Sequence, residues 1–343
     1  MCSEINHCIP MKTEAITKPL IQWRGIRHWG MGAVLLTLLM MAGIARAQSL
    51  AYSNAIVALN PAGYWPMHEV EAAAPGDIET NYGSLGVLGN GYYPDYQINS
   101  GAFVRQLPGP LANGADTSVL FTEPVSDSGG ATNSLFVPHT SPLTTLQAPF
   151  TIELWYMISN LPVAGFQGDF ISQCNGNKDQ GFRIYFQDAG TNSTVTGADI
   201  LFYNTTTLNQ GFQVNFGGAP TNQWHYMVVT VDTSDNVSTY LDGVLQTAAG
   251  TDPRQIPAGR YNPDFHDPLT IGNGLGNLRG FNGGIAEVAI YTNVISDIAT
   301  HYSDATNVNS AANQYFNDVM ADDPIIYLRM NSSPYAAPNP STS

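Results

Sequence analysis

Cysteine is scarce in this sequence, with three residues in 343. Cys2 and Cys8 fall within the first 47 residues, which have the pattern of an export leader, so only Cys174 is left for a folded part of 296 residues. One cysteine cannot form an intrachain disulfide, and we therefore expect a hydrophobic core to stabilise the fold. Because no histidine or other base lies close to it in sequence, Cys174 is interpreted as a small buried residue at a strand end and not as a nucleophile.

Charged residues are scarce as well, at 11% of the sequence, against about 25% in an average globular chain. The first 47 residues hold five of the 12 Lys and Arg residues and two of the 27 Asp and Glu residues, which leaves seven basic and 25 acidic residues and a net charge of −18. Phosphate groups are bound by clustered Lys and Arg side chains, which this sequence lacks. We therefore exclude nucleic acid as a partner and expect no binding to anionic membrane surfaces.

The motifs of the common catalytic sites are missing. There is no G-x-S-x-G nucleophile motif, no phosphate-binding loop that leads into a helix and no H-E-x-x-H zinc motif. A glycoside hydrolase on a β fold needs two carboxylates on one face of a strand, two or four residues apart, but the same-face neighbours of Glu153 and Glu287 are uncharged. The sequence therefore predicts a protein that is not an enzyme, with glycoside hydrolysis as the less favoured alternative.

The first 47 residues, 1–47, are interpreted as a signal peptide. An uncharged apolar run of twelve residues, 33–44, follows a basic stretch, and small residues stand at positions 45 and 47, which a signal peptidase reads. The apolar run is shorter than the roughly 20 residues of a membrane-spanning helix. We expect cleavage before Gln48, a secreted or cell-surface location, and no membrane insertion once the leader is removed.

The rest of the sequence has the pattern of many short strands. In FTIELWYMI, residues 150–158, every second residue is apolar, and the opposite face also carries Trp155 and Met157. The same alternation recurs in GFRIYFQ, DILFY and WHYMVVTVD, and Asp242-Gly243 predicts a tight hairpin turn. These features predict an all-β fold, a two-sheet antiparallel jelly-roll sandwich.

Only one stretch after the leader has a helical pattern. In ISDIATHY, residues 295–302, the side chains of Ile295, Ile298 and Tyr302 recur at helical spacing, and Ser296 can cap the first turn. We therefore expect one short helix at the periphery of the sandwich.

The order of these segments resembles a known family. FTIELWYMIS is followed by QWHYMVVTVDTSDNVSTYLDGVL, then by LTIGN and by FNGGIAEVAIYTNVISDIATHY. This series is similar to the laminin-G-like jelly-roll domains of the concanavalin A-like lectin and glucanase superfamily, especially those of exported bacterial proteins. The resemblance covers residues 50 to about 305, and it implies one such domain over residues 48–305.

A segment near the start of the chain recurs near its end. AYSNAIVALNPAGYWPM, residues 51–67, and QYFNDVMADDPIIYLRM, residues 314–330, share a Tyr-Asn-Pro-Tyr-Met pattern at a constant offset of 263. Units of the resembled family often begin with such a segment, so we interpret residues 306–343 as the truncated start of a second similar unit, or as a tail. Without the rest of its own sandwich, this segment is expected to be poorly packed or to be borrowed as an edge strand.

Candidate binding residues lie in LFYNTTTLNQGFQVNF, residues 201–216. Sugars are bound by aromatic faces beside Asn, Asp and Gln side chains, and this segment combines both. The four residues that we predict to bind a ligand are Tyr203, Asn204, Phe212 and Asn215. Strand-edge packing and turn formation remain the alternative interpretation of the same residues.

Loop carboxylates make calcium the one metal to consider, because calcium is bound by six to eight oxygen atoms. The candidate ligands are Asp264, His266 and Asp267, together with Asp116, Glu123 and Asp127 in earlier loops. Their spacing defines no ligand set, and Ala286 stands where the resembled family often has Asp. No cofactor is assigned, and a structural calcium ion stays open.

The sequence thus predicts an exported, non-catalytic, lectin-like module that binds carbohydrate or another cell-surface or extracellular partner. The alternative is a purely structural spacer domain of a multi-domain surface protein, and an active glycoside hydrolase ranks behind both. The ligand and the oligomeric state are left open at this point.

Overall fold

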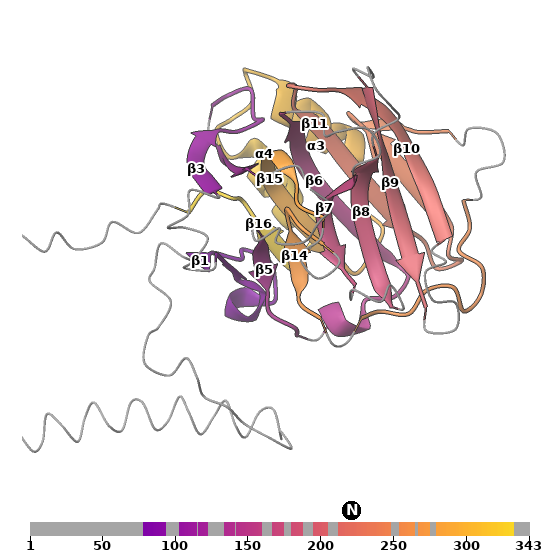
Figure 1. Cartoon of the computed structure of the whole chain (residues 1–343). Coiled ribbons are helices and arrows are strands. Elements are labelled where there is room, and N and C mark those ends of the chain that lie inside the picture. The colour runs from indigo at the N-terminus through magenta and orange to yellow at the C-terminus, as the bar shows by residue number, and fades with distance from the viewer. Residues whose placement is uncertain are drawn as a thin grey trace, which may run out of the picture. The chain divides into compact units, whose positions relative to one another are not determined.

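Two antiparallel β-sheets are stacked face to face in this protein (Figure 1). The computed structural model describes residues 78–93, 103–114, 116–122, 134–140, 142–159, 167–174, 180–187, 195–204, 212–247, 254–264, 267–274 and 279–332. All of them belong to one compact unit, residues 73–343. The interpreted signal peptide and the first copy of the repeated segment, residues 51–67, lie outside the described residues.

The first sheet, sheet A, has eight strands in the order β1-β2-β5-β14-β7-β8-β9-β10. Their bounds are β1 (Ile78–Glu79), β2 (Gly91–Tyr92), β5 (Leu135–Val137), β14 (Leu269–Ile271), β7 (Gln167–Gln173), β8 (Gly181–Gln187), β9 (Val195–Tyr203) and β10 (Phe212–Pro220). Two 3₁₀ turns, η2 (Gly86–Gly89) and η3 (Leu143–Thr145), lie in connections of the chain.

The second sheet, sheet B, has the order β13-β12-β11-β6-β15-β4-β3, with β16 paired to β15. Its strands are β13 (Val244–Leu245), β12 (Val237–Leu241), β11 (His225–Val231), β6 (Phe150–Ile158), β15 (Asn282–Tyr291), β4 (Thr117–Thr122), β3 (Phe103–Pro108) and β16 (Ile326–Leu328). The sequence-based prediction of an antiparallel jelly-roll sandwich is confirmed.

The core between the sheets follows from the alternation in the strands. Five alternate residues of β6, from Phe150 to Ile158, lie in one cluster and are at most 2% exposed. Alternate residues of β8 and β9, among them Phe182 and Phe202, belong to the same cluster from the other sheet. Burial of each such side chain contributes roughly 1.5–3 kcal/mol, which is how a domain without a disulfide is held together.

The outer face of sheet B is covered by two helices, α3 (Ile298–Thr306) and α4 (Gln314–Ala321). Trp155, Tyr226 and Tyr291 from the strands form a second buried cluster with Ile298 of α3 and Val319 of α4. In Figure 1 both helices lie behind sheet B as seen from β8 and β9. The apolar second face of FTIELWYMI therefore packs against helices.

The expectation of a single helix was wrong, because the described residues also contain α4. Only Tyr315 and Val319 of its eight residues are buried. Two apolar residues four positions apart give a short and weak helical signal, and the Tyr and Pro residues around them suggested a strand instead. The predicted hairpin turn is confirmed, since Asp242 and Gly243 have positive φ angles of 52° and 76°.

The segment after residue 305 is mostly exposed at residues 306–313 and well packed at residues 324–330. β16 pairs antiparallel with β15, and the side chains of Ile326, Tyr327 and Leu328 are fully buried. Of the two alternatives, a strand that is added to the sheet describes β16, and poor packing is wrong for residues 324–330. The start of a second unit at residue 306 stays a prediction.

The described residues include no helix with the length and apolar character that a bilayer crossing requires.

Candidate functional site

A polar and aromatic cluster lies on the face of sheet A that points away from the core. Strand register aligns Asp169 of β7, Tyr185 of β8 and Asp199 of β9 in one row across the sheet. Because successive side chains of a strand point to opposite faces, Arg183 and Tyr203 share this outer face, while Phe182 and Phe202 point into the core. We call these five residues the sheet-A cluster: Asp169, Arg183, Tyr185, Asp199 and Tyr203.

Arg183 lies at the centre of the sheet-A cluster. Its guanidinium forms an ion pair with Asp169, hydrogen-bonds with Tyr203 and lies 4.1 Å from the ring centroid of Tyr185. Burial opposes its charge, but Asp169 raises the pKa of Arg183 above its ordinary value, so the cation is retained. Burial also raises the pKa of both tyrosines, which keeps their hydroxyl groups neutral. The cluster therefore offers a fixed cation, carboxylates and phenol groups on three rigid strands.

The cluster is nearly enclosed, since each of its five side chains is at most 3% exposed. Cys174 lies beside Tyr203 and is 6% exposed. Burial raises the pKa of this thiol to about 12, and a neutral buried thiol is a poor nucleophile. Its interpretation as a small buried residue is confirmed.

The four predicted binding residues are placed differently by the structure. Tyr203 belongs to the sheet-A cluster, whereas the Asn204 side chain is 1% exposed and donates a hydrogen bond to the carbonyl of Gly259. On β10, Phe212 is the register partner of Phe202 and Asn215 that of Asp199, but their side chains lie outside the described part of the chain. Ligand binding by these four residues stays a prediction.

The sequence analysis missed four members of the cluster: Asp169, Arg183, Tyr185 and Asp199. The alternation in GFRIYFQ does separate Arg183 and Tyr185 from the core residues. Their meeting with two aspartates depends on the register between three strands, which a single sequence does not display.

Asp116 and Asp264, two of the candidate calcium ligands, accept hydrogen bonds from the protein backbone. Asp116 accepts a hydrogen bond from the backbone of Leu111, and burial raises its pKa to about 6. Asp264 accepts one from the backbone of Asp267. Among the residues that the structure describes, no three His, Cys, Asp or Glu side chains gather in a way that could hold a metal ion. Glu123, Asp127 and His266 lie outside those residues.

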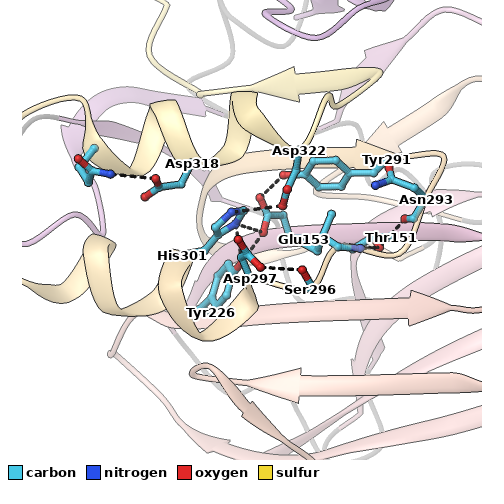
Figure 2. Close-up of polar contacts among 12 residues, drawn as sticks. Thr151, Glu153, Tyr226, Tyr291, Asn293, Ser296, Asp297, His301, Asp318 and Asp322 are labelled. Carbon is cyan, nitrogen blue, oxygen red and sulfur yellow. Dashed lines mark hydrogen bonds and ion pairs between the residues drawn. The ribbon is translucent and has the colours of Figure 1, made fainter.

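A second polar group, the Glu153 network, lies beneath α3 and α4 (Figure 2). The Glu153 carboxylate accepts hydrogen bonds from the hydroxyls of Tyr291, at 2.6 Å, and Tyr226. Nδ1 of His301 lies 3.2 Å from the same carboxylate, and Nε2 lies 3.4 Å from Asp322. An imidazole whose two nitrogens both face carboxylates is suited to carry a proton on each.

The Glu153 network is enclosed. Glu153 and His301 are at most 1% exposed, and Asp322 has 22% of its side chain in contact with solvent. Burial lowers the pKa of His301, but Glu153 and Asp322 together raise it above the ordinary value. His301 of α3 thus joins Glu153 of β6 to Asp322, the residue that follows α4. We therefore assign this network a structural role, and we take the sheet-A cluster as the candidate functional site.

Comparison with known proteins agrees with this fold. The sequence model of a laminin-G family described as the "Concanavalin A-like lectin/glucanases superfamily" matches residues 128–298. This region is a laminin-G-like domain of that superfamily. The match includes β6 to β15, and so the whole sheet-A cluster. No curated protein sequence matches the chain.

Solved structures with similar architecture include the CBM40 of the Ruminococcus gnavus IT-sialidase, at 17% identity and a TM-score of 0.40, with 55% of this chain and 97% of that chain covered. The binding domain of Botulinum neurotoxin DC in complex with SialylT matches at 14% identity and 0.37, with 55% and 40% covered. The Trypanosoma rangeli sialidase in complex with the inhibitor DANA matches at 14% and 0.37, with 54% and 27% covered.

Proposed function

We propose that this laminin-G-like domain is an exported, non-catalytic module that binds a glycan through the outer face of sheet A. The observation that carries the proposal is the ion pair of Arg183 and Asp169 between two tyrosines on that face. A buried ion pair is weak evidence for stability, because apolar residues of similar volume often stabilise a fold as well or better. The pair lies outside the apolar core and supports the proposal in this way, but it is at most 1% exposed, so a glycan contacts it only after the residues that cover it have moved.

The chemistry of the sheet-A cluster suits a polyhydroxylated ligand. Sugar hydroxyls donate to carboxylates and accept from a guanidinium, while tyrosine rings pack against their C–H faces. The side chains are also fixed before a ligand arrives, because Arg183 is in contact with Asp169, Tyr185 and Tyr203 at once. Groups that are held in place lose little conformational entropy on binding.

A glycan array with the full chain tests the proposal, with immobilised extracellular matrix proteins as a second panel. Tyr203→Phe removes only the hydroxyl that contacts Arg183, and we expect it to weaken glycan binding by about tenfold, roughly 1.4 kcal/mol. Tyr240→Phe, a matched change on β12 of sheet B, should leave binding unchanged. Binding to matrix proteins alone would replace the glycan with a protein partner, and no binding to either panel would remove the recognition role.

A structural spacer is the second candidate function, and the low exposure of Tyr203, at 2%, and Asn204, at 1%, favours it. A spacer domain needs no ligand. If neither the wild-type chain nor Tyr203→Phe binds any glycan on the array, the spacer function is favoured.

Glycoside hydrolysis is tested separately, because Asp169 and Asp199 lie on the same row of sheet A with one strand between them. Asp169 is ion-paired with Arg183, which suits a fixed carboxylate and not a proton donor. We expect no release of reducing sugar from β-glucans or galactans. Hydrolysis that is lost in Asp199→Asn would overturn the non-catalytic part of the proposal.

A further inference from the structure

Residues 314–332, which we call the C-terminal segment, are an addition to the outer face of sheet B. The segment contains α4 and β16 and follows a mostly exposed linker, residues 306–313. Tyr315 and Val319 of α4 pack in one buried cluster with Trp155 of β6. β16 pairs with β15 but stands off the main strand order of sheet B. The segment can therefore leave the sandwich without separating any other pair of strands.

The sandwich contacts this segment through buried carboxyl groups. Glu287 of β15 is fully buried, accepts a hydrogen bond from the hydroxyl of Tyr327 and lies 3.1 Å from Nε of Arg329. Glu79 of β1 is also fully buried and accepts a hydrogen bond from the N–H of Asn331 at 2.9 Å. These three partners belong to the segment. Because burial disfavours the charged form of a carboxyl group, covering by the segment favours a protonated Glu79 and Glu287.

The segment brings a single basic side chain to these acids. Arg329 is the one Lys or Arg in residues 306–343, and its charge acts on both Glu287 and Asp116. Asp116 is 7% exposed and accepts a hydrogen bond from the backbone of Leu111. One cation thus faces two buried carboxyl groups. If both were ionised, one negative charge would be buried without compensation, which is strongly unfavourable.

α4 is attached through a pair of carboxyl groups and a histidine. Asp318 of α4 is in hydrogen-bond contact with Asp304 of α3, and two carboxyl groups can form such a bond only while one of them holds a proton. Nε2 of His301 lies 3.4 Å from Asp322, and its Nδ1 lies 3.2 Å from Glu153. Both of these contacts are ion pairs only while the imidazole is charged. Protons therefore strengthen the attachment of α4 as well.

The other titratable side chains around these groups do not reverse this direction. They are Asp297, Tyr93, Arg105, Tyr226, Tyr291 and Tyr315. Burial raises the pKa of each of the four tyrosines, which keeps their hydroxyl groups neutral. Asp297 opposes a negative charge on Asp322. Arg105 lies over the ring of Tyr93, 4.8 Å from its centroid.

The shifts at the interface all have the same sign. Burial raises the pKa of Glu79 and Asp322, that of Asp116 to about 6 and that of Glu287 to about 8. The carboxylates around His301 raise its pKa although burial acts against them. A group with a raised pKa stabilises the docked state fully below its ordinary value, and this contribution is lost as the pH rises through the raised pKa. Docking of the segment therefore takes up protons.

We propose that the C-terminal segment is a pH-dependent cover of sheet B, which is docked in acid and at neutral pH and is released from an intact sandwich in alkaline solution. Release uncovers the edge of β15 at residues 288–290 and the aromatic cluster around Trp155.

Hydrogen exchange of the full chain at a series of pH values tests the release, with the intrinsic exchange rate divided out. The amides of Ile325 and Tyr327 report from the segment. The amides of Tyr82 and Leu85 report from the sandwich, because they donate to carbonyl groups of the segment. From about pH 6 to about pH 9.5, we expect these four amides to lose protection at least about tenfold more than the amides of β6 and β11. A loss that is equal in β6 and β11 would be global unfolding and would overturn the proposal.

Two variants test the cause of the release. Glu287→Gln has a neutral side chain at every pH, so we expect its alkaline loss of protection to be smaller than that of wild type by about tenfold. Asp323→Asn removes an exposed carboxylate of the same segment and is the matched control, which should behave as wild type. Equal losses in wild type and Glu287→Gln would refute the role of the buried carboxyl groups and with it the proposal.

Limited proteolysis of the wild-type chain provides a readout that depends on no variant. Trypsin cleaves after Lys or Arg, and Arg329 is 12% exposed in the docked segment. We therefore expect cleavage after Arg329, seen by mass spectrometry as loss of residues 330–343, to be at least about tenfold faster at about pH 9 than at about pH 7. A short peptide with the sequence around Arg329 corrects for the pH dependence of trypsin itself. Equal corrected rates at the two pH values would show that the segment stays docked.

Discussion

Tyr291 of β15 and Glu153 of β6 lie two register positions apart on the same face of sheet B, with the hydroxyl 2.6 Å from the carboxylate. The bulge between Ala286 and Ala289 decides this contact. Because a shift of one residue turns every later side chain to the other face, β15 without its bulge would point Tyr291 into the core and leave Glu153 with fewer donors.

Replacement of Glu153 by Ala should destabilise the fold strongly. Tyr226, Tyr291 and His301 would lose their common acceptor, and the loss of one partner from a buried ion pair costs about 3–5 kcal/mol. Urea unfolding at neutral pH measures the free energy of unfolding, with Ser303→Ala on the exposed face of α3 as the control. A loss below about 1 kcal/mol would contradict the structural role of the network.

His301 should make the stability depend on pH. The pKa of His301 is raised above its ordinary 6.5 in the fold, where Glu153, Asp322 and Asp318 act against the effect of burial. A raised pKa means that the stabilisation is complete below pH 6.5 and is lost as the pH rises through the folded-state pKa. The difference in unfolding free energy between wild type and His301→Gln should therefore be largest below pH 6.5 and shrink as the pH rises through the raised pKa of His301. His139→Gln, at an exposed position, is the control for loss of a histidine side chain.

Glu287 should oppose stability at alkaline pH. Burial raises the pKa of this carboxyl from 4.5 to about 8, although Arg329 and Tyr327 act against the shift. The folded state then holds a proton that the unfolded chain releases, so this contribution is present below pH 4.5 and is lost as the pH rises through about 8. Relative to Glu287→Gln, the wild type should lose on the order of 5 kcal/mol across that range. Urea unfolding at a series of pH values measures this difference. Equal dependence of the unfolding free energy on pH in the two proteins would contradict the raised pKa of Glu287.

Gly181 should tolerate no side chain. It has a φ of +85°, and a Cβ at this position would lie 1.7 Å from the carbonyl oxygen of Gln173. Gly181→Ala therefore combines backbone strain with a backbone clash, and we expect a loss of more than about 2 kcal/mol. Gly114→Ala is the matched control, because Gly114 has a φ of +66° with open space around it, and about 1 kcal/mol is expected there. Equal losses for the two variants would show that the clash is relieved at no cost.

Strand positions were predictable because each strand carries its own alternation. The pattern of FTIELWYMI separates a core face from an outer face whatever the strand pairs with, and β6 spans the same nine residues. The tight turn at Asp242-Gly243 is local in the same way, because its positive φ angles are restricted to a few residue types. The helix at 298–306 was found for this reason too, although it begins at Ile298 after Asp297 and not after Ser296.

The candidate sites were not predictable in the same way. Asp169 and Arg183 are 14 residues apart in sequence, and Glu153 and His301 are 148 apart. Their meeting depends on which strands are neighbours and on bulges that shift the register by one residue. The pattern of a single strand shows neither its neighbours nor the bulges. The sequence therefore indicated Tyr203 but not Arg183, which contacts it.

The amino-acid sequence by itself determined the class of fold, the absence of a disulfide in the part after residue 47, the acidic charge and the repeated Tyr-Asn-Pro-Tyr-Met pattern, because composition and local periodicity act within a few residues. The tertiary structure decided that the second copy of this pattern packs on sheet B, that Glu153 is buried beneath two helices, and that Arg183 meets Asp169 on the outer face of sheet A. These are contacts between distant parts of the chain, and they form only when strand order, register and burial are fixed together.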